Sequence, residues 1–384
     1  MQTVNRTHSS DSSGAINICH IASGDLWAGA ETVVHNLLTH LSGYTDLNVM
    51  AVLLNNGPLA EKIRALRLPV TIIDENQTAF WEICRRLRRI VREHHIDILH
   101  SHRYKENMLA YISSIALKGV SLVTTQHGIP ELYDNKNNIP YRFKSGLNYR
   151  LMKRKFDGVV AVSNDIEKIF TGTYRFDPRR VSAIPNGIEI PEKVNEKGTG
   201  SSLKVGSAGR LFPVKDYRLF VEIANETVRS KKNVVFSLAG DGPDRASIEN
   251  YVGRLGLEKT FLLKGALNNM HDFYEDLDIY VNTSIHEGIP MTVLEAMSHQ
   301  LPIIAPKIGG IDEIVRDGVE GFLVPDRDAA LFAEKIAGLL ENRSLLKEMG
   351  IAARERVVSH FSSQQMAETY CNLYKKLRSL NRET

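Results

Sequence analysis

Cysteine is scarce in this sequence, and the positions of its three occurrences exclude two common architectures. Cys19, Cys84 and Cys371 lie far apart and form no Cys-x-x-Cys pair. This spacing fits neither a zinc knuckle nor a disulfide framework, whereas it does fit a protein of a reducing compartment.

Long apolar segments are missing as well. No stretch approaches the roughly 20 apolar residues that a membrane-spanning helix needs. Residues 1–14 are polar and lack the apolar core of a signal peptide. The sequence therefore predicts a cytoplasmic protein whose first fourteen residues are disordered.

A strong net charge is also absent. The chain has 48 Lys and Arg against 45 Asp and Glu, a formal charge of +3, which is too small to indicate a nucleic-acid partner. Residues 1–200 carry 25 basic and 20 acidic side chains, and the remainder carries 23 and 25. This asymmetry has two explanations that charge alone does not separate: the first half meets something anionic, or its solvated surface is unevenly charged.

What the sequence does contain is a regular alternation of short apolar runs with amphipathic helical patterns. Ile16–Ile21 precedes Ala30–Leu41, Leu47–Leu54 precedes Leu59–Leu66, and the alternation restarts at Lys204–Ala208. Apolar strands that alternate with helices are typical of a parallel sheet covered on both faces. Since 384 residues is too long for one ordinary core, the sequence predicts two Rossmann-like, doubly wound α/β domains.

The domain boundaries follow from where this alternation pauses. A first domain is expected at residues 15–190, a polar linker at 191–203 and a second domain at 204–361. The tail, residues 362–384, has one long helical pattern and is expected to pack back on the first domain. Because parallel sheets bind ligands beyond the carboxyl ends of their strands, the expected site is the cleft between the two domains.

One segment, residues 286–297, has the chemistry of an anion site. A strand precedes it, and a helix is expected to begin near Pro290, where proline is tolerated because a first-turn N–H has no partner within the helix. Gly288 allows backbone to come close to a ligand. The free N–H groups of Ile289, Met291 and Thr292, at the positive end of the helix dipole, would bind a diphosphate.

Two glutamates flank this anion site. Glu287 lies in the loop, and Glu295 lies just over one turn into the helix, on the face toward the cleft. A carboxylate accepts two hydrogen bonds and suits the vicinal hydroxyls of a sugar or a ribose. A helix that merely favours acidic residues in its first turn would explain Glu287 but not the neighbouring Gly-x-Pro.

The segment from Glu287 to Met297, Glu-Gly-Ile-Pro-Met-Thr-Val-Leu-Glu-Ala-Met, resembles the signature of the family 4 retaining glycosyltransferases of GT-B fold. The resemblance extends from about residue 15 to residue 380. Supporting motifs occur in the family's order: Ala28-Gly29-Ala30-Glu31, Thr125-Gln126-His127-Gly128, Val162-Ser163, Ile184-Pro185-Asn186-Gly187, Gly209-Arg210-Leu211 with Lys215, Ala239-Gly240-Asp241-Gly242-Pro243, and Gly309-Gly310 with Glu313.

The resemblance implies catalytic roles for four residues. Arg210 and Lys215 would hold the diphosphate and stabilise the charge that grows on the leaving phosphate. His127 would hydrogen-bond the donor sugar, and Glu287 would bind the same sugar. The first domain would then bind the acceptor, and the second the nucleotide sugar.

The remaining donor-binding positions are implied in the same way. Glu295 would bind the ribose, and the backbone of Gly265–Leu267 would meet the base. The full expected donor-binding set is Gly29, Gly209, Gly265, Leu267, Gly288, Ile289, Pro290, Met291, Thr292 and Glu295. Ala28 departs from the family, which usually has a second glycine there, and Trp27 beside it is unusual.

No metal or other cofactor is expected. Asp276-x-Asp278 and Asp326-x-Asp328 match a metal-binding motif of other transferases, but two matches among 45 acidic residues are expected by chance. His100-x-His102 would lie on one face of a strand without a visible third ligand, which favours a structural or acceptor-cleft role. Without a metal or an activated nucleophile, the resemblance implies retention by front-face substitution, with the leaving phosphate taking the acceptor's proton.

Two basic segments account for the positive first half. In residues 80–91 the apolar positions form one helical stripe with the arginines largely off it, which favours a core helix with a solvated arginine face. Residues 141–155 carry six cations and no acid, interleaved with aromatic and aliphatic residues. This composition favours contact with an anionic membrane surface or a lipid-linked acceptor.

The sequence thus predicts a metal-independent, retaining hexosyltransferase. It would move a sugar from a nucleotide sugar, with UDP favoured, to a glycan or lipid-linked glycan in cell-envelope polysaccharide biosynthesis, at the inner face of the membrane. The alternatives are a sugar-nucleotide 2-epimerase, or a catalytically silent scaffold of a polysaccharide assembly. A phosphorylase would need a pyridoxal lysine, and none is evident.

Overall fold

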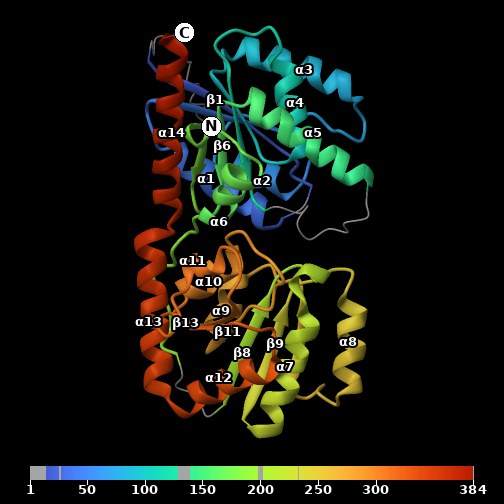
Figure 1. Cartoon of the computed structure of the whole chain (residues 1–384), viewed down its shortest axis with the longest axis vertical. Coiled ribbons are helices and arrows are strands. Elements are labelled where there is room, and N and C mark those ends of the chain that lie inside the picture. The colour runs from blue at the N-terminus through green and yellow to red at the C-terminus, as the bar shows by residue number, and fades with distance from the viewer. Residues whose placement is uncertain (1–13, 26, 129–138, 198–201, 232, 384) are drawn as a thin grey trace, which may run out of the picture.

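The computed structural model describes residues 14–25, 27–128, 139–197, 202–231 and 233–383. Apart from Gly14, the segment expected to be disordered, residues 1–14, lies outside the described residues. Two α/β domains lie one above the other, and a helical C-terminal segment runs along both (Figure 1).

The first domain is built on a seven-stranded parallel sheet, ordered β3-β2-β1-β4-β5-β6-β7. Its strands are short and mostly buried, as expected for a sheet covered on both faces. They are β1 (Ile16–Ala22), β2 (Leu47–Leu53), β3 (Val70–Ile72), β4 (Ile98–Ser101), β5 (Ser121–Gln126), β6 (Gly158–Ala161) and β7 (Val181–Ala183), and the helices are α1 (Gly29–Leu41), α2 (Pro58–Ala65), α3 (Phe80–Glu93), α4 (Tyr104–Ser114), α5 (Ile139–Lys155) and α6 (Asn164–Lys168).

The second domain repeats the plan with six parallel strands, ordered β10-β9-β8-β11-β12-β13. The strands are β8 (Leu203–Ala208), β9 (Val234–Ala239), β10 (Phe261–Gly265), β11 (Ile279–Val281), β12 (Ile303–Pro306) and β13 (Gly321–Val324). The helices are α7 (Tyr217–Ser230), α8 (Arg245–Arg254), α9 (Met270–Glu275), α10 (Met291–Ser298), α11 (Ile311–Ile314), α12 (Ala329–Glu341) and α13 (Arg343–His360).

Both strand orders confirm the predicted doubly wound fold. In each sheet, strands are added first on one side of the first strand and then on the other. This reversal of strand order lies between β1 and β4 in the first domain and between β8 and β11 in the second. The crevice at such a reversal, at the carboxyl ends of the strands, is where ligands bind in open α/β sheets.

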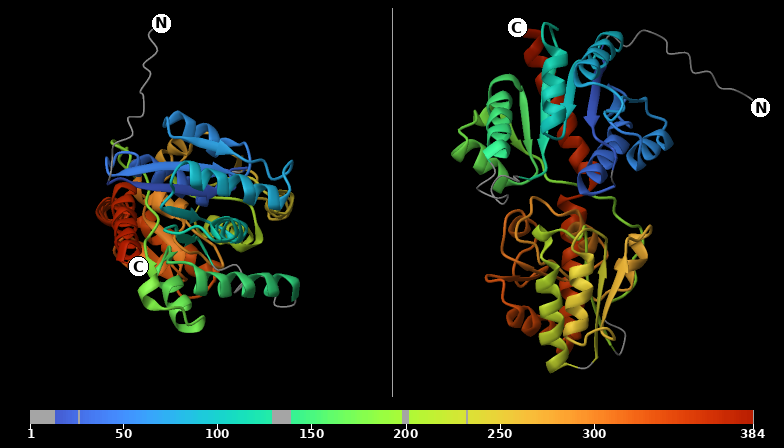
Figure 2. Two further views of the ribbon diagram at one scale, coloured as in Figure 1. Left: turned by 90° about the horizontal axis from the view of Figure 1, so that it is seen from above. Right: turned by 90° about the vertical axis from the view of Figure 1, so that its right-hand side faces the viewer.

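The chain crosses between the domains twice. Ile188 and Ser362 form a parallel bridge at the crossing, and a Cβ on Gly187 would lie 2.5 Å from the Ser362 carbonyl oxygen, so this close approach requires glycine. Beyond it, α14 (Ser363–Glu383) packs against α1 of the first domain. Figures 1 and 2 show α14 continuing the line of α13 from the second domain along the first.

The linker between the domains is more firmly docked than its composition suggests. The composition of residues 191–203 predicts almost nothing to bury, yet Lys197 is buried, and its ammonium donates to the carbonyl oxygens of Tyr274 and Glu275, at 3.0 Å each. These carbonyls lie at the end of α9, where a cation is favourable. Leu203, placed in the linker by composition, begins β8.

The two basic helices of the first domain differ from each other in what they bury. In α3, Ile83, Cys84, Leu87 and Val91 are buried, which confirms the predicted core stripe. In α5, Tyr149 and Met152 are also buried in the first-domain core, so the apolar positions expected to face a membrane belong partly to the protein interior. The side chains of residues 139–144 lie outside the described structure.

Helices long and apolar enough to cross a membrane are absent from the described part of the chain.

Candidate active site

A cavity of about 620 Å³ lies between the two domains. It is lined by segments that follow β1 and β5 in the first domain, and β8, β9, β10 and β11 in the second. Twelve of the fourteen predicted site residues line it: Gly29, His127, Gly209, Arg210, Lys215, Leu267, Glu287, Ile289, Pro290, Met291, Thr292 and Glu295. The two predicted residues that do not line it are Gly265 and Gly288.

Gly288 contributes to the cavity indirectly. Its own position is buried, and a Cβ there would lie 2.7 Å from the His127 carbonyl oxygen and 3.0 Å from Cγ2 of Val162. Glycine is therefore required for the second domain to approach the first, rather than for backbone to approach a ligand. The prediction of a glycine at a close approach was correct, but the partner is the opposite domain.

The start of α10 has the geometry of an anion site. Pro290 lies one position before the first helical residue, with an extended backbone (φ −74°, ψ 118°), and not within the first turn as expected. The Val293 N–H donates to the Pro290 carbonyl oxygen at 3.2 Å. The N–H groups of Ile289, Met291 and Thr292 form no hydrogen bond with another described residue, so they are available to an anion at the cavity wall.

Lys215 and Glu287 form an ion pair at the edge of this anion site. Ser284 donates its hydroxyl proton to the same carboxylate oxygen at 2.6 Å. Arg327 stabilises the loop that carries Glu287 by donating to the carbonyl oxygens of Thr283 and Ser284, at 2.9 Å each. The carboxylate is therefore fixed before any ligand arrives.

Arg210 is the more exposed of the two predicted cations. Its guanidinium lies over the ring of Phe212, 4.3 Å from the ring centroid, and the residue lines the cavity. No carboxylate among the described residues pairs with it. An arginine that is stacked but not paired keeps its donors available for phosphate oxygens.

Glu295 is half-buried in the lining of the cavity. One of its carboxylate oxygens accepts the Tyr274 hydroxyl proton at 2.7 Å. Burial raises the pKa of Glu295, whereas the Tyr274 hydrogen bond lowers it. The sequence motif identified Glu295 but gave no sign of Tyr274, because Tyr274 lies 21 residues away on α9.

His127 faces this charged wall from the first domain. It follows β5 and stacks on His102, with ring centroids 5.6 Å apart. Burial lowers the pKa of His127 to about 4, so the imidazole is neutral at physiological pH. Its Nδ1 is buried and has no hydrogen-bond partner among the described residues, which leaves one polar atom for a ligand.

Further contacts fix one domain on the other near the cavity. Glu313 of α11 accepts hydrogen bonds from the backbone N–H groups of Asn164 and Asp165, at 2.9 and 2.8 Å, and so caps α6 of the first domain. The Asn186 side chain donates to the Ile289 carbonyl oxygen at 2.9 Å. Each contact joins two segments that are more than 100 positions apart in the sequence.

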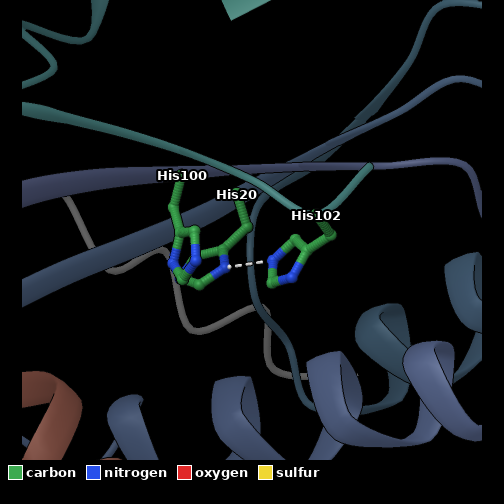
Figure 3. Close-up of side chains that lie close together, drawn as sticks. All are labelled: His20, His100 and His102. Carbon is green, nitrogen blue, oxygen red and sulfur yellow. Dashed lines mark hydrogen bonds between the residues drawn. The ribbon is translucent and has the colours of Figure 1, made fainter. Parts of the chain in front are cut away.

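Two groups of side chains have the composition of a metal site. The first, His20, His100 and His102, supplies the third histidine that the sequence did not reveal, with nitrogen atoms within 4.8 Å of one another (Figure 3). Both ring nitrogens of His100 are already bonded, to Tyr374 at 2.6 Å and Thr125 at 2.8 Å. The second group, on α9 and just after α10, is His271, Glu275 and His299.

The two Asp-x-Asp motifs have structural partners. Asp278 accepts from the Lys204 backbone N–H at 2.8 Å, and Asp276 pairs with the Lys204 ammonium. Asp328 caps α12 by accepting from the Ala330 N–H at 2.8 Å. All four aspartates lie away from the cavity lining.

Family models match almost the whole two-domain chain. The model of Glycosyltransferase Family 4 matches residues 27–191, and that of Glycosyl transferases group 1 matches residues 189–356. The chain belongs to the family 4 glycosyltransferases. The predicted family and the predicted GT-B fold are both confirmed.

Named relatives of this glycosyltransferase extend along most of its length. UDP-Gal:alpha-D-GlcNAc-diphosphoundecaprenol alpha-1,3-galactosyltransferase of Escherichia coli is 25% identical over 381 residues, which cover 94% of this chain and 96% of that protein. N-acetyl-alpha-D-glucosaminyl L-malate synthase of Bacillus anthracis is 25% identical over 307 residues, covering 75% and 77%.

Solved structures share the fold. The Anabaena protein HepE, determined in complex with UDP and glucose, superimposes with a TM-score of 0.81 at 19% identity, covering 94% of this chain and 99% of that one. At this identity the likeness shows the fold of the glycosyltransferase and its two-domain arrangement. The comparisons lend no support to the epimerase or the silent scaffold.

Proposed function

We propose that this glycosyltransferase moves a hexose from a UDP-sugar, with retention and without a metal, to a glycan or lipid-linked glycan of the cell envelope. One observation carries the proposal. The cavity joins backbone N–H donors at α10, which have no partner among the described residues, with two cations and two carboxylates. That combination suits a diphosphate flanked by a sugar and a ribose.

The diphosphate would bind at the start of α10, beside Arg210 and Lys215. Lys215 would then divide its charge between Glu287 and the phosphate, and the helix end would supply the remaining donors. Together these groups stabilise the charge on the leaving phosphate, the role that a metal has in other transferases. The leaving phosphate would take the acceptor's proton on the same face of the sugar.

The two ends of the donor would be held by different domains. Glu287 and His127 approach the sugar from opposite walls of the cavity, and Glu295, oriented by Tyr274, binds the ribose. Leu267 and the adjacent backbone lie beyond Glu295, where the base is expected. The names of the E. coli relative and of the HepE complex favour UDP as the nucleotide.

The acceptor would reach the cavity from the first domain. Gly29 and Trp27 line the opening there, and Trp27 is 41% exposed. The E. coli relative acts, by its name, on a diphosphoundecaprenol-linked sugar. A lipid-linked acceptor would place the first domain near a membrane surface, peripheral on its cytoplasmic face.

The basic helix α5 is the proposed membrane-facing element within residues 141–155. Because Tyr149 and Met152 are buried, the attraction would come from the exposed cations Arg150, Lys153 and Arg154. Each cation near an anionic surface contributes about 1 kcal/mol, and the effect falls off within a Debye length.

The donor proposal is tested by screening UDP-, GDP- and ADP-sugars for hydrolysis and for transfer to a pyrophosphate-linked N-acetylglucosamine lipid, with and without EDTA. We expect turnover with a UDP-sugar, unchanged by EDTA, and a product whose anomeric configuration, followed by NMR, matches that of the donor. Inversion, or loss of activity with EDTA that added metal restores, would refute the retention or the metal independence.

The membrane proposal is tested by co-sedimentation with vesicles at low salt. We expect binding to anionic but not to zwitterionic vesicles, and weaker binding for a variant with Arg150, Lys153 and Arg154 changed to Gln. A variant with the exposed Arg85, Arg86 and Arg89 of α3 changed to Gln, which also removes three charges, is the matched control. Equal binding to both lipids, or equal loss in both variants, would contradict the role of α5.

A further inference from the structure

Behind His127, a continuous line of buried polar side chains runs through the first domain to α14. We call it the histidine chain. Its seven members, in order from the cavity, are His127, His102, His20, Tyr374, His100, Thr125 and Tyr370. Successive polar atoms lie 3.3, 3.2, 3.4, 2.6, 2.8 and 2.8 Å apart. Figure 3 shows its centre, where the rings of His20, His100 and His102 lie together.

Every member of the chain is both a donor and an acceptor. Burial lowers the pKa of His20 to about 3 and holds those of His100 and His102 well below the usual value, so these imidazoles are neutral. A neutral imidazole has one N–H and one bare nitrogen, and a hydroxyl has one proton. The histidine chain therefore leaves the fewest protons unpaired when all of them point the same way, toward His127 or toward Tyr370.

The two directions differ in how many buried groups they leave unpaired. If the protons point toward Tyr370, two are left without a partner among the described residues: the Tyr370 proton, because Thr125 donates to that hydroxyl, and the bare Nδ1 of His127. An unsatisfied buried donor costs about 1–3 kcal/mol. If they point toward His127, Tyr370 donates to Thr125, Thr125 to Nε2 of His100, and each later proton up to that of His102 finds an acceptor. Within the histidine chain only the His127 proton is then left unpaired among the described residues.

The favoured direction determines the state of His127. His100 then donates from Nδ1 to Tyr374, Tyr374 donates to Nε2 of His20, and His20 donates from Nδ1 to His102. His102 donates from Nδ1 to Nε2 of His127. The proton of His127 must consequently be on Nδ1, the atom without a partner among the described residues.

We propose that Tyr374 is a positioning residue which, through His20 and His102, fixes His127 as the Nδ1–H tautomer, so that it donates a hydrogen bond to an oxygen of the donor sugar. The inference rests on the proposed contact between His127 and the sugar. It extends the site to α14. The hydroxyls of Tyr370 and Tyr374 on this helix hydrogen-bond to first-domain residues more than 240 positions away in sequence. Tyr374 touches no substrate and acts only through the imidazoles.

The tautomers are measured directly by long-range proton–nitrogen NMR on the full chain with ¹⁵N-labelled histidine, using His127→Ala to assign the signal. In the wild type we expect His127 with its proton on Nδ1. Tyr374→Phe cuts the chain between its directing end and the cavity, so His127 should populate the Nε2–H form. Tyr370→Phe is the matched control, because the Thr125 hydroxyl still has His100 as its acceptor, and it should keep the wild-type tautomer.

Ligand affinity supplies the second measurement. Tyr374→Phe should weaken binding of UDP-galactose, or of the UDP-sugar that is turned over, by about 2- to 10-fold, the value of one neutral hydrogen bond. Affinity for UDP should not change, because UDP lacks the sugar. Tyr370→Phe should change neither. Equal losses for UDP and the UDP-sugar would indicate a purely structural role for Tyr374 and overturn the inference.

The outcomes separate this inference from the proposed function. A wild-type His127 with its proton on Nε2, or an unchanged tautomer in Tyr374→Phe, refutes the directed chain. If His127→Ala binds UDP and the UDP-sugar as the wild type does, the proposed sugar contact is wrong, and with it the functional part of the inference. The wild-type spectrum decides the direction of the chain whether or not either variant folds.

Discussion

The two walls of the cavity are built from opposite kinds of chemistry. The second-domain wall is charged, with Arg210, Lys215 and Glu287 near the start of α10. The first-domain wall contributes His127, which is half-buried, neutral and backed by further neutral imidazoles. Charges next to a helix end bind a charged leaving group, whereas a neutral, dry wall suits a sugar and preserves the strength of each hydrogen bond.

The difference also concerns how each wall is encoded. Glu287 and the helix end that it flanks lie within a dozen residues of one another, so local sequence is enough to specify them. His20 and Tyr374, by contrast, are 354 positions apart and meet only because α14 returns to the first domain. A wall assembled from β1, β4, β5 and α14 has no continuous motif.

The largest expected effect is that acid lowers the stability of the first domain more than that of the second. Burial lowers the pKa of His20 to about 3 and that of His127 to about 4, from about 6.5 in the unfolded chain. Between pH 6.5 and these values the unfolded state binds more protons than the folded state. The contribution of these neutral imidazoles to the free energy of unfolding is therefore fully present above pH 6.5. It is lost as the pH falls, by about 1.4 kcal/mol per pH unit for each such imidazole.

Urea unfolding between pH 7.5 and pH 5 measures this loss. Both tryptophans, Trp27 and Trp81, are in the first domain, so their fluorescence follows that domain alone, whereas circular dichroism follows both. As the pH is lowered, the urea midpoint measured by fluorescence should fall faster than the midpoint measured by circular dichroism. The buried carboxyls Glu106 and Glu295 have raised pKa values and titrate in the opposite sense. Parallel loss in both signals would contradict the assignment of acid sensitivity to the histidines.

Lys215→Ala tests the charged wall. The substitution removes a cation from the leaving phosphate and leaves Glu287 without its ion-pair partner, so kcat should fall by about 100-fold. Lys204→Ala is the matched control, because Lys204 also forms an ion pair, with Asp276, but at the opposite end of β8 from the cavity. Steady-state kinetics with the best UDP-sugar gives the comparison. Wild-type kcat in Lys215→Ala would remove the assigned phosphate role.

Glu313→Gln tests the connection between the walls and should have the smallest effect. Glu313 caps α6 across the domain boundary, and the loss of its charge weakens that cap by about 0.5–1 kcal/mol. We expect kcat/KM to fall about 2- to 5-fold while the affinity for UDP is unchanged. Asp312→Asn, which alters an exposed pair with Lys307 next to it, should leave kcat/KM unaltered. An equal change in both variants would indicate a general surface effect.

Several elements were predictable because their signals are local. The predicted strands Ile16–Ile21 and Lys204–Ala208 and the predicted helix Ala30–Leu41 agree with the structure to within one residue at each end. The docked Lys197 was not predictable, since its partners are carbonyl oxygens of α9 that no composition reveals. The burial of Tyr149 and Met152 was not predictable either. A helix of aromatic and basic residues has the same composition whether its apolar side chains face a membrane or pack in a protein core.

By itself the sequence determined the two doubly wound domains, and it predicted the anion site at α10 and the residues Arg210, Lys215, Glu287 and Glu295. Each depends on periodicity or on neighbours within a few turns. Only the tertiary structure decided that Gly288 serves domain contact, that Tyr274 orients Glu295, and that Tyr374 stands behind His127. Those relations join distant segments, and hydrogen bonds between buried groups depend on position in space rather than on order in the chain.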